Sequence, residues 1–261
     1  MRDSPFEENG KIQTDDNTNI VATTSSSITP CDAGSSETTC SMACNALVPY
    51  QPELNTPLKR FKVPTRTFEF AGRQLTIQQK WDDHGVAAVV WDSAVVLCEF
   101  LEREKHLVKN KNIIELGSGT GLVGLVAAYL GGNVTVTERE SVLDNLHSIV
   151  KENIQDDKTT EINVLKLDWR DDLTNSFSPE YDLILGADII YIEETFPDLQ
   201  RTLLYLSNQP NCMILLSCKI RYEKDSKFLE KMGNDFTVKR LVYEPERDIS
   251  IYKIKRKCID Q

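Results

Sequence analysis

The sequence has 261 residues, 40% of them hydrophobic and 27% charged, which is enough for one α/β domain and too long for a small disulfide-stapled module. Thirty lysines and arginines against forty aspartates and glutamates give a formal net charge of −10, which disfavours nucleic-acid binding and favours a basic partner. The sequence has no apolar run of about eighteen residues and no apolar leader, which argues against a membrane span and against export. It has seven cysteines without a CxxC pair and three scattered histidines. We therefore expect reduced thiols, a cytoplasmic location and no metal site.

The first 45 residues differ in composition from the rest of the chain. They contain 14 serines or threonines, seven acids, two bases and a single aromatic residue, Phe6. Such a stretch cannot bury enough apolar surface to offset the entropy lost on ordering. We therefore expect a disordered acidic tail over residues 1–45 and one folded domain over residues 46–261.

Two local patterns come first in the expected domain. In FEFAGRQLTIQQ, apolar and polar residues alternate on either side of the turn-forming pair Ala71-Gly72, which predicts a β-hairpin. From Val86 to Glu102 the apolar residues recur every three or four positions, which predicts an amphipathic helix.

Seven short apolar runs follow and predict a sheet. The runs are Asn112–Leu116, Val134–Thr137, Ile162–Leu167, Tyr181–Leu185, Met213–Ser217, Phe236–Tyr243 and Ser250–Ile254. The first five are separated by segments long enough for crossover helices, whereas only a short turn around Pro245 joins the last two. The fold class is therefore α/β, a doubly wound, mostly parallel, Rossmann-like seven-stranded sheet with an antiparallel edge hairpin.

The segment IIELGSGTGLVGLVAAYLGG combines a strand, a glycine-rich turn and a helix predicted to run through Leu130. Glycines let backbone N–H groups approach a ligand closely, and a helix N-terminus favours a carboxylate. Glu138, 21 residues after Gly117, ends the next predicted strand and could accept hydrogen bonds from ribose hydroxyls. A plain tight turn, with Glu138 as the N-terminal acid of the following helix, is the alternative interpretation.

The register of this turn separates two cofactor classes. A dinucleotide GxGxxG match would use Gly119, Gly121 and Gly124, but Gly117 and Ser118 then stand between the strand and the motif, and Gly124 falls a full turn into the helix. Counted from Glu115, ELGSGTG has the acid-x-Gly-x-Gly-x-Gly pattern, which resembles the first motif of class I methyltransferases. That resemblance implies S-adenosylmethionine as the cofactor.

Four strings make the resemblance more specific. They are GVAAVVWD (Gly85–Asp92), ELGSGTGLVG (Glu115–Gly124), SPEYDLILGADIIYIEETF (Ser178–Phe196) and IRYEKD (Ile220–Asp225). Together they resemble the methyltransferase-like twenty-one group of protein-lysine methyltransferases, from about Ala46 to Lys257, and most of all its member that modifies heat-shock chaperones of the seventy-kilodalton class. The resemblance implies a protein substrate, such a chaperone, and transfer of methyl groups to a lysine.

The resemblance also implies a cofactor site. The residues that match it are Trp91, Gly117, Ser118, Gly119, Glu138, Trp169 and Ala187. Trp169 would pack on the adenine, and Glu138 stands where the family usually has aspartate, so it would reach the ribose with a longer side chain. Asp168 could accept from the adenine amino group or be a solvated loop acid, and Trp91 could line the cofactor pocket or pack in the core.

Asp188 and Tyr191 match the family's DxxY motif, which implies that they are the catalytic residues. They end the fourth predicted strand, at the sheet edge where doubly wound folds bind ligands. Asp188 would orient the lysine amine or relay its proton, and Tyr191 would shape the lysine channel. The alternative is a helix-capping aspartate with a half-buried tyrosine packed behind it.

Two other functions are weighed against lysine methylation. A module that keeps the cofactor fold but only docks to chaperones would need no intact DxxY motif. A nucleic-acid adenine methyltransferase usually has Pro-Pro where this chain has Ile189-Ile190, and the negative charge also disfavours it. We therefore expect a monomeric enzyme with a protein substrate, no nucleic-acid partner and no membrane association.

Overall fold

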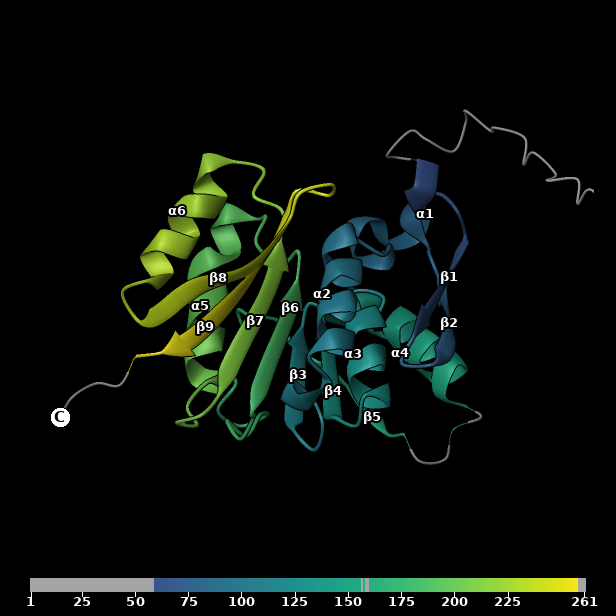
Figure 1. Cartoon of the computed structure of the whole chain (residues 1–261), viewed down its shortest axis with the longest axis horizontal. Coiled ribbons are helices and arrows are strands. Elements are labelled where there is room, and N and C mark those ends of the chain that lie inside the picture. The colour runs from purple at the N-terminus through teal and green to yellow at the C-terminus, as the bar shows by residue number, and fades with distance from the viewer. Residues whose placement is uncertain (1–58, 156, 158–159, 258–261) are drawn as a thin grey trace, which may run out of the picture. The chain divides into compact units, whose positions relative to one another are not determined.

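A computed structural model describes residues 59–155, 157 and 160–257 (Figure 1). The expected acidic tail, residues 1–45, and the start of the expected domain lie outside these residues. The helices and strands, in chain order, are η2 (Lys59–Phe61), β1 (Thr65–Phe70), β2 (Arg73–Gln78), α1 (Trp81–His84), η3 (Gly85–Ala88), α2 (Asp92–Arg103), η4 (Lys105–Leu107), β3 (Asn112–Leu116), α3 (Leu122–Tyr129), β4 (Asn133–Glu138), α4 (Glu140–Ile154), β5 (Ile162–Lys166), β6 (Leu183–Ala187), η5 (Glu193–Thr195), α5 (Phe196–Leu206), β7 (Met213–Cys218), α6 (Glu223–Met232), β8 (Phe236–Glu244) and β9 (Ile249–Arg256).

The seven predicted strands form one sheet in the order β5-β4-β3-β6-β7-β9-β8. The pairs among β5, β4, β3, β6 and β7 are parallel, whereas β9 pairs antiparallel with both β7 and β8. The chain thus starts its parallel sheet in the middle, at β3, and builds outward in both directions. The predicted doubly wound, mostly parallel sheet with an antiparallel edge hairpin is confirmed.

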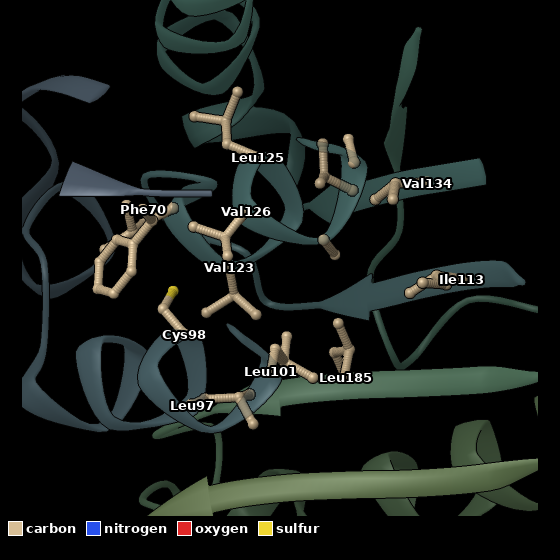
Figure 2. Packing of buried hydrophobic residues seen from close by; sticks show 14 of the residues in the cluster. Phe70, Leu97, Cys98, Leu101, Ile113, Val123, Leu125, Val126, Val134 and Leu185 are labelled. Atoms are coloured by element: carbon tan, nitrogen blue, oxygen red, sulfur yellow. The ribbon is translucent and has the colours of Figure 1, made fainter. Parts of the chain in front are cut away.

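Helices cover both faces of this sheet. Neighbouring residues of a strand point to opposite faces, so they belong to different cores. Ile113 and Leu185 belong to the core beneath α2, α3 and α4, and Figure 2 shows Leu185 beside Leu101 of α2. Ile114 and Ile184 belong to a second core beneath α5 and α6. Strands buried on both sides explain why the sequence shows continuous apolar runs here and no alternation.

The predicted N-terminal hairpin is confirmed as the antiparallel pair β1–β2. Its turn residues Ala71 and Gly72 both have positive φ, 52° and 69°, as a tight two-residue hairpin turn requires. Leu75 and Ile77 are buried in the first core, and the Asn153 side chain in α4 pairs with the backbone of Thr76. The hairpin is therefore packed onto the helical layer and lies outside the main sheet.

The predicted helix over Val86–Glu102 is wrong in its first part, since α2 begins only at Asp92. Before it, Gly85–Ala88 form the 3-10 helix η3, and Val89 and Trp91 are extended, with φ/ψ of −136°/155° and −81°/151°. The Val90 N–H donates to the buried Gln79 side chain at 2.9 Å, and this bond holds the segment away from helical geometry. Val89 and Val90 are apolar because both are buried, and their positions in the sequence match helical spacing although neither lies on a helix.

Helix α2 has a buried apolar face that belongs to the first core. In the described part of the chain, no single helix is long and apolar enough to cross a membrane. Trp81–Ala88 and Asp92–Arg103 pass such a test only together, as a pair bent by 49°. The hydrophobicity of α2 is accounted for by its packing in the core.

The predicted crossover helix between the third and fourth strands is absent, since residues 167–182 form only turns and bends. Side chains make local turns here: Asp172 accepts from the backbone and hydroxyl of Thr174, and Asp168 accepts from the Arg170 backbone. Such bonds compete with helix formation. The apolar residues Leu173 and Phe177 instead anchor the connection in the second core.

Strand β6, Leu183–Ala187, begins and ends two residues later than the predicted Tyr181–Leu185. Its start is set by Asp182, whose carboxylate accepts from the Asn112 N–H at 2.9 Å. A Cβ on Gly186 would lie 2.6 Å from Ile189 and 2.9 Å from Leu216. Glycine is needed for close packing inside the strand, and the displacement makes Ala187 the last residue of the strand, at its carboxyl end.

Candidate active site

One pocket of about 430 Å³ opens at the carboxyl ends of the parallel strands. Its walls come from η3, the start of α2, the turn after β3, the ends of β4 and β6, and the loops after β5, β6 and β7. The structure brings together in this pocket all nine predicted site residues, Trp91, Gly117, Ser118, Gly119, Glu138, Trp169, Ala187, Asp188 and Tyr191. Residues from six separate segments thus share one cavity at the edge where this fold class binds ligands.

The glycine-rich turn forms the floor of the pocket. Gly117 and Gly119 have φ values of 59° and 55°, and a Cβ would lie 3.0 Å from Ile189 at the first and 2.9 Å from the Ala87 carbonyl oxygen at the second. Ser118 fixes the turn to β4, because its N–H donates to the Thr137 carbonyl and its hydroxyl accepts from the Thr137 N–H. Backbone, and no side chain, therefore faces the cavity at the glycines.

Glu115 and Gly124 join the turn to the helix that follows it. The Glu115 carboxylate is 2% exposed and accepts the Gly124 N–H at 2.9 Å. Burial raises the pKa of Glu115 to about 8. A Cβ on Gly124 would lie 2.2 Å from Val136, so this glycine serves close packing in the first turn of α3, one turn earlier than expected. The third glycine of the dinucleotide motif has the same packing role, so Gly124 does not separate the two cofactor classes.

Glu138 places a buried carboxylate in the pocket wall at the end of β4. It is 7% exposed, its Oε2 accepts the Arg139 N–H at 2.6 Å, and burial raises its pKa. The nearest cation, the Arg139 guanidinium, lies 4.0 Å away. A carboxylate in this position has remaining lone pairs for ligand hydroxyls.

Trp169 and Asp168 approach the pocket from the loop after β5. The Trp169 ring lies close to the turn, with Cζ2 3.4 Å from where a Gly117 Cβ would be. Asp168 is held by Arg170 through bonds of 2.9 and 2.6 Å, which lower its pKa to about 2. Asp168 is therefore an ion-paired loop acid that lines the pocket, and the aromatic ring is the larger ligand-facing surface.

These features fit S-adenosylmethionine. The backbone cradle leads into the N-terminus of α3 and would take the methionine carboxylate, Glu138 would accept the ribose hydroxyls, and Trp169 would pack on the adenine. Each of these ligand groups has a protein group of matching chemistry in the same cavity.

Asp188 occupies a strained position at the end of β6. It has φ 56°, its side chain is only 5% exposed, and its N–H donates to the Ser217 carbonyl. The interpretation as a helix cap is wrong, because helical structure next begins at Glu193, and η5 and α5 have no side-chain cap. A non-glycine residue held in the left-handed region at a pocket is a feature common at functional sites.

The partner of Asp188 is Arg221, a residue to which the sequence analysis assigned no role. The Arg221 Nη1 and Nη2 atoms each donate to one oxygen of Asp188 at 2.8 Å, and these bonds raise the pKa of Arg221. The guanidinium also lies over the Trp91 ring, 5.5 Å from its centre. Arg221 is part of the string IRYEKD, which is the one signal that could have pointed to it.

Trp91 and Tyr191 line the same pocket as this ion pair. The Trp91 ring lies 4.8 Å from that of Phe61, and its Nε1 donates to the Val86 carbonyl at 2.9 Å, so it is a pocket wall and no part of the α2 core. Tyr191 is 39% exposed and lines the same pocket, which is compatible with a channel wall and with the half-buried tyrosine of the alternative interpretation. The ion pair and these two rings form an amphipathic channel wall, suited to an alkyl chain that ends in an amine.

The chain is similar to known lysine methyltransferases. Residues 69–235 match the family described as lysine methyltransferase. The chain is 47% identical over 208 residues to the protein N-lysine methyltransferase METTL21A of zebrafish, Danio rerio, covering 80% of this chain and 95% of the relative. It is 37% identical over 192 residues to EEF1A lysine methyltransferase 3 of Xenopus tropicalis, covering 72% and 84%.

Among solved structures, the fold is similar to that of the T. thermophilus 16S rRNA N2 G1207 methyltransferase RsmC in complex with AdoMet and guanosine. The TM-score is 0.52 at 15% identity, over 74% of this chain and 50% of that one, which supports the class I methyltransferase fold alone. The family match covers most of the expected domain and includes the glycine-rich turn, Glu138 and Asp188. The chain therefore belongs to the lysine methyltransferase family and is an S-adenosylmethionine-dependent protein-lysine N-methyltransferase.

Proposed function

We propose that this enzyme methylates a lysine of a heat-shock chaperone of the seventy-kilodalton class, as a monomer in the cytoplasm. Support comes from the four strings that resemble the chaperone-modifying member of the group. The 47% identity to the METTL21A relatives, against 37% to a relative named for EEF1A, also disfavours the elongation factor as substrate.

We also propose that Asp188 and Tyr191 act on the substrate lysine. The cofactor, when bound, supplies an electrophilic methyl group on a sulfonium. A lysine with pKa about 10.4 must lose its proton before it can react, which costs about 4 kcal/mol near neutral pH. Asp188 faces the pocket at the end of β6, where its carboxylate would accept a hydrogen bond from the amine and orient its lone pair.

Arg221 determines how much of Asp188 is available to the amine. Each Asp188 oxygen has two lone pairs, and Arg221 takes one on each, while the Lys219 N–H approaches Oδ1 at 3.5 Å. Oδ2 therefore keeps one free acceptor position. In this role Arg221 holds the carboxylate in one orientation and places a positive charge beside the channel, which favours the neutral form of an entering amine.

The walls of the channel would exclude water and align the alkyl chain. Trp91 and Tyr191 supply aromatic surface, and Arg221 lies on the Trp91 face. Holding the amine close to the methyl group in a single orientation would supply most of the rate enhancement.

The test is incubation with tritiated S-adenosylmethionine and, separately, purified seventy-kilodalton chaperone, purified EEF1A and total RNA, followed by gel autoradiography. Rapid label in the chaperone, with little in EEF1A or RNA, is the expected result. Preferential label in EEF1A would reject the proposed substrate and keep the activity, and label in RNA alone would reject both.

A further inference from the structure

An apolar surface surrounds the mouth of the pocket. In the part of the chain that the structure describes, seven large hydrophobic side chains are exposed, and four of them line this one pocket. We call these four the apolar rim: Val86, Tyr191, Ile192 and Tyr222, which are 42%, 39%, 37% and 66% exposed. Single exposed hydrophobic residues are ordinary, but a group of them around one opening indicates an interaction site.

The apolar rim is held in place by bonds to its backbone. The Val86 carbonyl accepts from Trp91 Nε1 at 2.9 Å and the Tyr191 carbonyl from Lys224 Nζ at 2.9 Å. The Ile192 carbonyl accepts from Thr195 Oγ1 at 2.8 Å. Two separate segments, η3 and the loop after β6, are fixed in this way, so their backbone needs little further ordering on binding.

Charges near the apolar rim follow a pattern. Three arginines line the pocket, Arg139, Arg170 and Arg221, and the Lys224 ammonium lies 5.7 Å from the Tyr222 ring centre. The carboxylates in the pocket wall are buried or already bound to an arginine. Exposed acids, Glu193, Glu194 and Glu223, follow the rim residues in the chain. An apolar centre with a charged border is the usual anatomy of a protein–protein contact.

We propose that the apolar rim docks the segment of the substrate protein that carries the target lysine, and that it selects a lysine whose immediate neighbours are apolar or aromatic. This inference rests on lysine methylation in this pocket, although not on the chaperone being the substrate. A lysine can enter only if its backbone lies over the mouth, because its stem has just four carbons. Side chains beside it then meet the apolar rim.

The test compares a rim variant with a matched control. The rim variant is Ile192→Thr with Tyr222→Ser. The control is Leu241→Thr with Tyr243→Ser, on strand β8, where the exposures of 38% and 50% are similar and neither residue lines the pocket. For each protein we would measure KM and kcat for the purified chaperone, binding of S-adenosylhomocysteine by calorimetry, and the melting temperature.

The expected result is a rise in KM of at least tenfold for the rim variant, about 1.4 kcal/mol, with kcat within threefold and cofactor-product binding within twofold. The control should match the wild type in all measurements. Unchanged KM, an equal rise in the control, or loss of cofactor-product binding in the rim variant would each overturn the inference. If the rim variant melts far below the wild type, the same measurements are made on Tyr222→Ser alone, which changes the most exposed of the four residues, and the same criteria apply.

Two further outcomes separate this inference from the proposed function. If the wild type labels another protein of a cytosolic extract and leaves the chaperone unlabelled, the proposed substrate fails, and the same KM comparison on the labelled protein decides the role of the rim. If sedimentation shows a wild-type dimer that the rim variant breaks while KM is unchanged, the rim binds a second copy of the chain and the inference is rejected.

Discussion

Replacing Asp188 with asparagine separates its expected role in the reaction from its role in the fold. Asparagine tolerates the left-handed φ of 56° better than alanine would, so the backbone needs no further strain. It keeps one oxygen for Arg221 and loses one charge-assisted hydrogen bond, worth about 1.5–3 kcal/mol. Because Arg221 is about one third exposed, we expect the lower end of that range, a fall in melting temperature of roughly 3–6 °C.

The rate should fall far more than stability does. Loss of the carboxylate removes the charge that orients the amine, so we expect a decrease of at least about 10² in single-turnover methylation of the chaperone, with calorimetric binding of the cofactor unchanged. Glu99→Gln is the matched control. It removes the charge from a similar two-bond pair, Glu99 with Arg247 at 3.0 and 2.7 Å, remote from the pocket. A rate for Asp188→Asn within threefold of wild type, or an equal loss in Glu99→Gln, would refute the catalytic assignment.

Three further predictions concern cofactor binding and the N-terminal residues. Glu138→Ala should weaken the binding of S-adenosylmethionine and S-adenosylhomocysteine, measured by calorimetry, since it removes the carboxylate acceptor. If the wild type binds NAD more tightly than S-adenosylmethionine, the dinucleotide interpretation is restored. Gly119→Ala should weaken the same binding and lower the melting temperature more than Gly72→Ala does, because both have positive φ but only the Gly119 Cβ would meet backbone, 2.9 Å from an oxygen. Deletion of residues 1–45 should leave the melting temperature and the methylation rate nearly unchanged, and a large loss in either would show that they support the domain.

The sheet was predictable because its strands are buried on both faces. Asn112–Leu116 has the same bounds in sequence and structure, since a five-residue apolar run between polar residues has few other stable conformations in such a fold. The helix before it was misplaced because burial of Val89 and Val90 imitates helical spacing. One side chain, Gln79, decides the local conformation there, and its contact with the Val90 backbone is invisible to periodicity.

The same reasoning explains the result for the site. Residues at the carboxyl ends of parallel strands converge whatever their separation in sequence, so Glu138 and Asp188 could be placed in one pocket before the structure was known. Arg221 could not be placed there, because it follows a strand by several residues and no local sequence pattern predicts that its side chain binds a carboxylate 33 positions earlier. Their catalytic and binding roles stay predictions until the variants above are measured.

Glu115 shows that the acidic residue of a motif can serve the fold and give the protein a characteristic pH dependence. Its pKa of about 8 in the folded protein, raised by burial, is well above the usual value near 4.5. The folded protein therefore holds a proton that the unfolded chain releases. The stability contributed by this proton is complete below about pH 4.5 and falls as the pH rises toward 8, by a few kcal/mol in all.

Glu115→Gln keeps an oxygen for the Gly124 N–H and has no charge to bury, so its free energy of unfolding relative to wild type should increase between pH 5 and pH 9. Urea unfolding of both proteins at pH 5, 7 and 9 measures this difference, with Glu99→Gln as the control for a carboxylate outside the pocket. A constant difference across the range would show that Glu115 is charged in the fold at pH 5 and that burial does not control its proton.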